Sequence, residues 1–321
     1  MEYQEKIEEL RNILQTNLLP LIGKKVLIVD APYYNNIGDV LIWQGTLDFL
    51  KNNNIGILGV HSENTFLFPP IATDVTILLM GGGNFGDLWR SFQDFRIQII
   101  KAYPKNRIVM LPQSVYYHNE DLMVEDSNTF AAHKNLHLCA RDEASYKFFS
   151  RYFNKNHLYL LPDMAFAISD DTLNSYRARK TKKKLYFKRL DKELNSSVSI
   201  DNQNTDTHDW PSFEKFPFGV KFVGFCTNQI KKLPSSFIQK PLFEIIDEAA
   251  NHLVRKNEVR MGLEFLSVYG YILTTRLHAM ILGILLHTPV AYLDNTTGKL
   301  SAFADTWLQD LADVEAYDIA N

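Results

Sequence analysis

Short apolar segments alternate with segments of helical length through the first half of the chain, and this alternation limits the possible folds most. Three intervening segments, residues 40–51, 88–102 and 143–152, have the length and composition of helices. Six runs of four to six residues have the character of buried strands: 26–29, 55–60, 75–80, 107–111, 136–140 and 158–161. Runs that are apolar throughout are typical of parallel strands covered on both faces. The first half is therefore predicted to form a doubly wound α/β sheet, with the carboxyl ends of its strands at one functional edge.

The second half continues the α/β pattern with fewer clear strands, notably between residues 196 and 257. Residues 195–209 are polar and without periodicity, which predicts a long loop, with plain disorder as the alternative. The remaining elements are predicted helices at 263–269, 277–287 and 300–308, and strands at 271–273 and 290–293. A length of 321 residues suggests two domains. We place them at residues 1–170 and 171–321, with a boundary after Ile168.

Two segments are candidates for membrane contact. Residues 1–20 carry apolar side chains at helical spacing and predict an amphipathic helix, which packs on its own domain or, alternatively, docks on a membrane. Six of the eight residues 177–184 are basic, which indicates a solvated linker or a contact with anionic phospholipid or lipid diphosphate. The longest apolar run, residues 280–286, is too short to span a bilayer.

Composition limits the partners and the compartment. The 34 basic residues nearly cancel the 37 acidic ones, so the net charge of −3 does not favour nucleic acid. Cys139 and Cys226 both lie in apolar contexts and are predicted to be buried thiols rather than a disulfide framework. We therefore expect a cytoplasmic protein, with the inner face of the membrane as a further location.

A glycine-rich segment follows the strand at residues 75–80. Residues 81–86 read Gly-Gly-Gly-Asn-Phe-Gly and match the dinucleotide fingerprint in letters. However, residues 95–119 contain no carboxylate that could hold a ribose, so no dinucleotide cofactor is expected. Glycine still permits a close approach of backbone amides to a ligand. Gly82, Gly83 and Asn84 are thus candidate binding residues, and a tight turn without ligand is the alternative.

Further polar residues follow the predicted strands at the same edge of the sheet. The candidates are Asn36, Gly38 and Asp39 after the first strand, Gln113 and Ser114 after the fourth, and Arg141 after the fifth. The Asn36 turn is explained equally well by helix capping. Arg141 can present a guanidinium fork to a carboxylate or phosphate, or it can pair with Asp142.

Thr275, Arg276 and His278 lie between a predicted strand and an apolar helix. A threonine N-cap at 274 or 275 would place Arg276 and His278 in the first helical turn. Unpaired amides and the arginine would then form an anion site. A histidine there is a candidate general acid or base, and a structural core histidine is the alternative. Histidine spacings do not match zinc motifs and a nucleophile elbow is missing, so we expect neither a metal nor covalent catalysis.

Taken together and in this order, these motifs resemble the polysaccharide pyruvyl transferase family. The resemblance is carried by Asn36, Gly38 and Asp39, the glycines at 81–83 with Asn84, Pro112 with Gln113 and Ser114, Arg141 with Asp142, Pro162 with Asp163, and Thr275 to His278. It implies two Rossmann-like domains that face a cleft in a GT-B-like arrangement. It also implies transfer of a pyruvyl unit from phosphoenolpyruvate, a co-substrate, to a sugar as a cyclic ketal.

The resemblance also assigns roles. His278 matches the acid/base position, Arg276 and Arg141 match residues that contact phosphoenolpyruvate, and Asp39 is expected to share the base role. Arg189, Asp191 and Glu193 are similar to residues that open the second domain in relatives, or else form a surface salt-bridge patch. Asp209 and Trp210 resemble an Asp-Trp pair of exopolysaccharide members, in which Trp210 stacks on a sugar or anchors the fold. The acceptor is a polysaccharide hexose or a lipid-linked oligosaccharide. The alternatives are a glycosyltransferase that uses a nucleotide sugar and a non-catalytic glycan-binding component.

Overall fold

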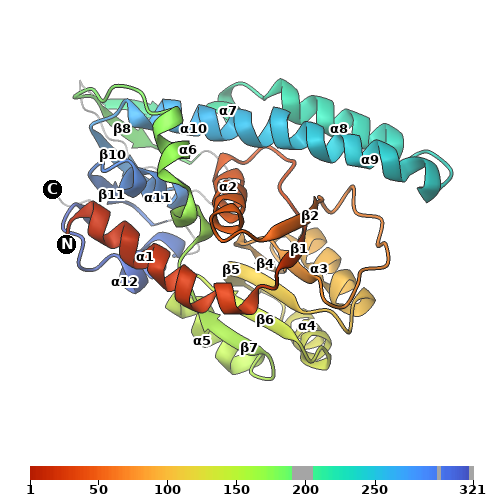
Figure 1. Ribbon diagram of the computed structural model, residues 1–321. Coiled ribbons are helices and arrows are strands. Elements are labelled where there is room, and N and C mark those ends of the chain that lie inside the picture. Colours follow the sequence, from red (N-terminus) through yellow and green to blue (C-terminus); the bar gives the residue numbers. More distant parts are fainter. Residues whose placement is uncertain (190–204, 295–297, 318–321) are drawn as a thin grey trace.

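Two parallel sheets with flanking helices form the molecule (Figure 1). The computed structural model describes residues 1–189, 205–294 and 298–317. The first sheet has seven strands in the order β2-β1-β3-β5-β6-β7, with β4 paired to β5. Its strands are β1 (Lys25–Val29), β2 (Gly56–Val60), β3 (Thr76–Leu79), β4 (Gly82–Gly86), β5 (Ile108–Tyr116), β6 (Leu136–Ala140) and β7 (His157–Leu160). All pairs are parallel, which confirms the α/β class predicted from the apolar runs.

The helices of the first half are α2 (Ile37–Asn52), α3 (Arg90–Ala102), α4 (Glu120–Ala132) and α5 (Glu143–Tyr152). Two details differ from the sequence prediction. β5 continues to Tyr116, so Gln113 and Ser114 lie within this strand rather than after it. The glycine-rich segment is not a turn but the short strand β4, which pairs with the extended part of β5.

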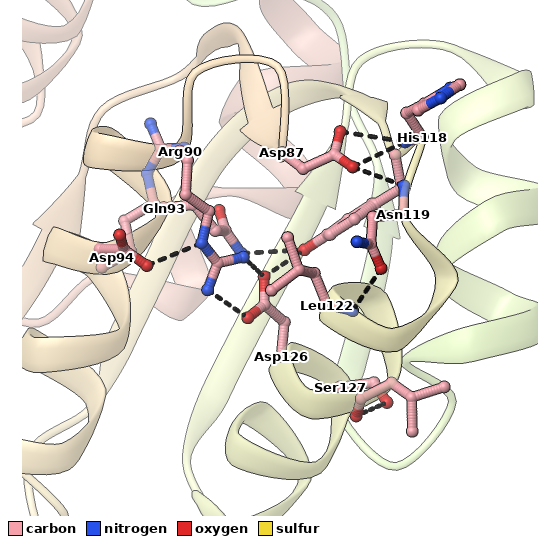
Figure 2. Close-up of polar contacts among 12 residues, drawn as sticks. Asp87, Arg90, Gln93, Asp94, His118, Asn119, Leu122, Asp126 and Ser127 are labelled. Atoms are coloured by element: carbon pink, nitrogen blue, oxygen red, sulfur yellow. Dashed lines mark hydrogen bonds and ion pairs between the residues drawn. The ribbon is translucent and has the colours of Figure 1, made fainter.

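Helix α4 was not predicted, because only Met123, Asp126 and Phe130 of its residues are buried. Polar contacts tie it to α3 (Figure 2). The guanidinium of Arg90 donates two hydrogen bonds to the buried carboxylate of Asp126, at 2.8 and 2.9 Å. Asp87 accepts hydrogen bonds from the backbone amides at the start of α4. A charged pair therefore replaces part of the apolar packing that the sequence pattern requires.

The second sheet has five parallel strands in the order β12-β11-β10-β8-β9. These are β8 (Lys184–Phe187), β9 (Thr205–His208), β10 (Tyr271–Thr274), β11 (Val290–Tyr292) and β12 (Val314–Ala316). The predicted loop at 195–209 is wrong for residues 205–208, which form β9; residues 195–204 lie outside the described part of the chain.

The segment in which few strands were evident is helical. α8 (Phe218–Ile230) and α9 (Ser236–Ala250) lie side by side, and a π-helical turn, η3 (Asn251–Lys256), leads from α9 into α10 (Asn257–Ser267) (Figure 1). The other elements of this half are η2 (Met164–Ala167), α6 (Asp170–Ser175), α7 (Pro211–Glu214), α11 (Leu277–Leu285) and α12 (Lys299–Trp307).

The first helix, α1 (Tyr3–Asn17), buries its apolar side chains in the protein core, as the packed interpretation predicted. Its contacts extend into the second half, since Tyr3 stacks on His287 beyond the end of α11, with ring centroids 5.5 Å apart. The turn η1 (Leu19–Leu21) follows α1. In the basic segment 177–184, Arg177 and Lys180 donate hydrogen bonds to carbonyls at the end of α11. Within the described residues, no helix is long and apolar enough to cross a membrane.

Candidate functional site

A pocket of about 1040 Å³ lies between the ends of the two sheets. Residues from both halves line it, and seven of the predicted site residues are among them: Asn36, Asp39, Gly83, Asn84, Arg141, Arg276 and His278. The other predicted residues lie behind the lining: Gly38, Gly82, Gln113, Ser114 and Thr275. The structure therefore brings the two arginines and the histidine together from segments far apart in the sequence.

Arg276 and His278 stand at the start of α11. The predicted threonine N-cap is wrong: Arg276 is the N-cap residue and no side chain caps the helix. Thr274 instead accepts a hydrogen bond at Oγ1 from the Arg276 amide, at 2.9 Å. Thr275 accepts one at Oγ1 from the amide of Arg189, also at 2.9 Å. The two threonines thus fix the backbone that leads into α11 rather than the helix amides.

The start of α2 faces the start of α11. A side chain at Gly38 would place its Cβ 2.4 Å from Nδ1 of His278, so only glycine permits this contact. Asn36 caps α2 by accepting a hydrogen bond from the Gly38 amide, at 3.1 Å. Two helix N-termini, each a region of positive potential, therefore meet beside the pocket. Gly38 acts by packing against His278 and not by lining the cavity.

His278 and Arg141 share one buried carboxylate. Oδ2 of Asp163 accepts a hydrogen bond from Nη1 of Arg141 at 2.8 Å and lies 3.4 Å from Nε2 of His278. Burial alone would raise the pKa of Asp163, but His278, Arg141 and the Ala165 amide outweigh it and lower the pKa to about 2. The His278 side chain is 13% exposed. Asp163 is thus an anion at neutral pH and can fix the orientation of the imidazole ring.

Arg276 is held by a second buried carboxylate. Its Nε and Nη2 donate to the two oxygens of Asp209, at 2.5 and 2.6 Å. The guanidinium also stands 4.9 Å from the ring centre of Phe213. A fork held by a carboxylate and an aromatic ring is pre-organised for a planar anionic group. The neighbouring Trp210 belongs to the pocket lining but is 1% exposed, and its ring centre lies 4.6 Å from that of Phe187, so it anchors this side of the pocket.

Asp39 lies across the pocket in the first turn of α2. Its Oδ2 accepts hydrogen bonds from the Tyr34 hydroxyl at 2.8 Å and from Nδ2 of Asn36 at 2.7 Å. These contacts place one carboxylate oxygen firmly. The aromatic side chains of Tyr34, Phe92 and Trp89 line the same region of the pocket.

The glycine-rich strand β4 forms another part of the lining. A Cβ on Gly83 would stand 2.9 Å from Nη2 of Arg141, and the Gly83 carbonyl accepts a hydrogen bond from Lys299 at 3.3 Å. Gly82 has a φ of 137°, a conformation that other residues rarely adopt. Arg96 donates to the side-chain oxygen of Asn84 at 2.6 Å. The glycines thus give Arg141 and Lys299 room to approach the pocket.

Two predicted residues support the site from behind. Ser114 donates to Asp142 at 2.5 Å and accepts from Nε of Arg141 at 2.8 Å. Gln113 donates to the Met80 carbonyl at 2.5 Å. Both side chains are buried because β5 is longer than its apolar run, so they lie behind the pocket lining and support it.

Sequence reasoning gave no role to Asp163 or Lys299. Asp163 belongs to the Pro-Asp motif that carries part of the resemblance. A buried arginine requires a counter-ion, and this requirement of Arg141 was the signal that could have identified Asp163. Lys299 carried no signal. Arg189 does line the pocket, whereas Asp191 and Glu193 lie outside the described residues.

These features define an α/β enzyme site that can bind a small dianion and move a proton. Two fixed guanidinium groups and two helix N-termini provide positive potential, and a histidine with an aspartate partner is a candidate acid/base group. The described residues contain no group of three or more side chains suited to a metal ion.

Comparison with known proteins identifies the family. The sequence profile of the polysaccharide pyruvyl transferase family matches residues 36–297. The chain is 31% identical over 298 residues to a Bacillus subtilis protein named "Putative pyruvyl transferase EpsO"; the match covers 92% of this chain and 89% of that protein. It is 27% identical to Pyruvyl transferase 1 of Schizosaccharomyces pombe, over 89% of this chain and 70% of the relative. The chain therefore belongs to the polysaccharide pyruvyl transferase family, and it is a pyruvyltransferase, as the resemblance predicted.

The fold also has a relative among solved structures. The crystal structure of a functionally uncharacterised protein from Klebsiella pneumoniae matches with a TM-score of 0.63 and 18% identity. The match covers 96% of this chain and 99% of that one. This likeness supports the architecture of the two sheets.

Proposed function

We propose that the protein transfers the pyruvyl group of phosphoenolpyruvate to a hexose of a polysaccharide or lipid-linked repeat unit, and forms a cyclic ketal. The observation that carries this proposal is the convergence of Arg141, Arg276 and His278 on one pocket. Phosphoenolpyruvate carries a phosphate and a carboxylate, which match two guanidinium groups at helix N-termini. We further propose that the two sheets act as the facing halves of a GT-B-like enzyme.

The reaction then proceeds through addition and replacement at one carbon. A sugar hydroxyl adds to C2 of phosphoenolpyruvate and gives its proton to Asp39, while C3 gains a proton from His278 and becomes a methyl group. Phosphate leaves C2 with its bonding electrons, and a second hydroxyl of the same sugar bonds to C2, passes its proton to the departing phosphate and closes the ketal. Arg276 and Arg141 hold the anionic groups and stabilise the departing phosphate.

His278 supplies the proton transfer in this proposal. The ring lines the pocket with Nε2 3.4 Å from Asp163, which holds the imidazole in place for proton exchange with the substrate. Asp39 acts as a base and accepts a proton from a sugar hydroxyl. Trp89 and Phe92, which line the pocket, offer flat apolar surfaces against which a pyranose ring can pack.

The test is incubation with phosphoenolpyruvate and a panel of bacterial glycans, followed by mass spectrometry of the glycan and measurement of free phosphate. We expect the mass of a pyruvyl ketal on one glycan and one phosphate per ketal. Calorimetry with phosphoenolpyruvate and with UDP-sugars is the accompanying measurement. Binding of a UDP-sugar with no binding of phosphoenolpyruvate would contradict the proposal and favour a glycosyltransferase. Glycan binding without phosphate release would indicate a non-catalytic component.

A further inference from the structure

Helix α8 exposes an apolar stripe. Phe218, Phe222 and Phe225 follow each other at intervals of four and three residues, which places them on one face of the helix. They are 75%, 41% and 63% exposed, and the rings of Phe218 and Phe222 stack at 5.9 Å. The opposite face of α8 is buried through Val220 and Val223. We call the three exposed residues the α8 phenylalanine stripe.

The antiparallel neighbour of α8 also exposes apolar side chains. α9 follows α8 along the upper edge of the molecule in Figure 1. Near its start Phe237 is 88% exposed, and Ile238 and Ile245 are exposed as well. Exposed apolar side chains that cluster on one element usually mark an interaction surface, because water does not stabilise such a patch.

The charge of α8 and the turn after it is opposite to that of the whole chain. Residues 218–235 contain three lysines and no aspartate or glutamate, a local charge of +3, whereas the chain carries −3. α9 adds one lysine and three acidic residues, so the positive charge lies on α8 and the turn. Lys221 lies beside the stripe, with its ammonium 5.5 Å from the ring centre of Phe216. Lys231 and Lys232 are exposed in the turn between the two helices. Phenylalanines interleaved with lysines are typical of helices that bind at the interface of an anionic bilayer.

The stripe borders the candidate active site. Phe225 and Lys221 belong both to the exposed face of α8 and to the lining of the pocket, and Phe216 does so just before the helix. A ligand embedded in a surface that contacts this face would therefore reach the pocket without crossing bulk water.

We propose that α8 and α9 dock the protein on an anionic lipid bilayer and bring the pocket to a lipid-linked acceptor. The acceptor part of this inference rests on the proposed function, but the docking part does not. A second copy of the chain is a less suitable occupant. A two-fold interface at this face would bring the same lysines of both copies together without added carboxylates. Anionic headgroups neutralise those lysines while the phenylalanines enter the acyl boundary.

The experiment is co-sedimentation of the full chain with vesicles of phosphatidylcholine containing about 30% phosphatidylglycerol. The test variant combines Phe218→Ser and Phe222→Ser, two exposed residues outside the pocket lining. We expect vesicle binding to fall about tenfold or more, because the apolar part of the contact is lost. A variant with Lys231→Glu and Lys232→Glu should lose binding mainly to the anionic vesicles, and added salt should weaken binding of the wild-type protein.

The matched control combines Leu58→Ser and Val124→Ser, which remove exposed apolar side chains from β2 and α4. It should bind vesicles as the wild type does. Failure of the wild type to sediment, or equal binding by the phenylalanine variant, would overturn the proposal. A wild-type dimer in light scattering that the phenylalanine variant dissociates would also overturn it, in favour of a self-interface.

Activity separates this proposal from the proposed function. The phenylalanine variant should transfer pyruvyl to a short water-soluble acceptor at the wild-type rate and to a lipid-linked acceptor in vesicles more slowly. If the wild type transfers pyruvyl to neither acceptor but binds vesicles through the stripe, the proposed function fails and docking stands. Equal rates of the variant on both acceptors would remove the link between docking and acceptor.

Discussion

Two buried aspartates near the pocket have nearly the same neighbours, but their pKa values are shifted in opposite directions. Asp163 accepts hydrogen bonds from the Ala165 amide at 2.9 Å and from Arg141 at 2.8 Å. Asp30, at the end of β1, accepts from the Met80 amide at 2.6 Å and from Arg96 at 3.0 Å. The pKa of Asp163 is lowered to about 2, whereas burial raises the pKa of Asp30 to about 6 despite its arginine.

The difference lies in the second cation. His278 adds to Arg141 at Asp163, while Asp30 has Arg96 as its cation and feels the carboxylate of Glu63. One arginine and one amide therefore do not offset the cost of burying a carboxylate, and a second cation does. Asp163 remains an anion and lies beside the pocket histidine. Asp30 instead binds Arg96, which in turn donates a hydrogen bond to Asn84.

Removing the second cation should have the largest effect. We expect His278→Ala to lower pyruvyl transfer about 10²–10⁴-fold, because the proposed acid/base group is lost. The same change should raise the pKa of Asp163 toward that of Asp30, which carboxyl NMR titration measures. His118→Ala, at an exposed position, is the matched control. Near-normal turnover of His278→Ala with a folded protein would show that Asp163 is tuned for structure alone.

Loss of the Arg276 fork should weaken substrate use less severely. We expect Arg276→Ala to raise the KM for phosphoenolpyruvate about 10–100-fold, the value of one or two charge-assisted hydrogen bonds. Arg276→Lys should recover part of this loss, since it restores the charge without the fork. Steady-state kinetics at saturating acceptor measures the KM of both variants and so separates the loss of the charge from the loss of the fork. An unchanged KM in both variants would mean that Arg276 only balances Asp209.

Replacing each of the two aspartates with asparagine should change the stability of the protein by different amounts. At pH 7 we expect Asp163→Asn to lower the free energy of unfolding by about 2 kcal/mol, because its lowered pKa records a net stabilising charge. This stability is present above about pH 4 and is lost as the pH falls through 2. Asp30→Asn should cost less than about 1 kcal/mol at pH 7, since its raised pKa records an unfavourable charge. Urea unfolding of both variants at pH 7 and pH 5 provides the measurement, and equal losses at pH 7 would contradict the comparison.

The regular part of the fold was predictable because periodicity reports burial. The apolar runs located six strands of the first sheet, and α5 was predicted at residues 143–152, where the structure has it. The glycine-rich strand β4 and the far end of β5 were missed, because polar and small residues continue the pairing beyond the apolar run. Helix α4 was missed because the Arg90–Asp126 pair takes the place of an apolar contact.

The site was predictable to the level of motifs. Asn36, Asp39, Arg141, Arg276 and His278 line one pocket, as the order of motifs and the topology of a parallel sheet indicated. The pairing of Arg141 with Asp163 and of Arg276 with Asp209 was not predicted, because these contacts join residues distant in sequence. The exposed phenylalanines of α8 also carried no signal, since helical spacing alone does not show which apolar face is buried.

A third buried carboxyl extends the comparison and gives the smallest expected effect. Glu258 on α10 is buried, and among the described residues no cation lies within ion-pair distance of it. Burial raises its pKa from 4.5 to about 8, with Asp39 adding repulsion. The order of pKa values in Asp163, Asp30 and Glu258 thus follows the number of nearby cations, from two to none.

Glu258→Gln tests this order through its dependence on pH. A raised pKa means that the stability contributed by Glu258 is complete below about pH 4.5 and is lost as the pH rises through 8, because the folded protein holds a proton that the unfolded chain releases. Glutamine does not titrate, so the variant should lose less stability between pH 5 and pH 9. Near pH 8 it should be more stable by about 1 kcal/mol, since burial of the amide offsets part of the gain. Glu264→Gln, on the same helix and exposed, is the control. Parallel urea-unfolding curves for the wild type and Glu258→Gln across this pH range would show that counting cations does not explain these three carboxyls.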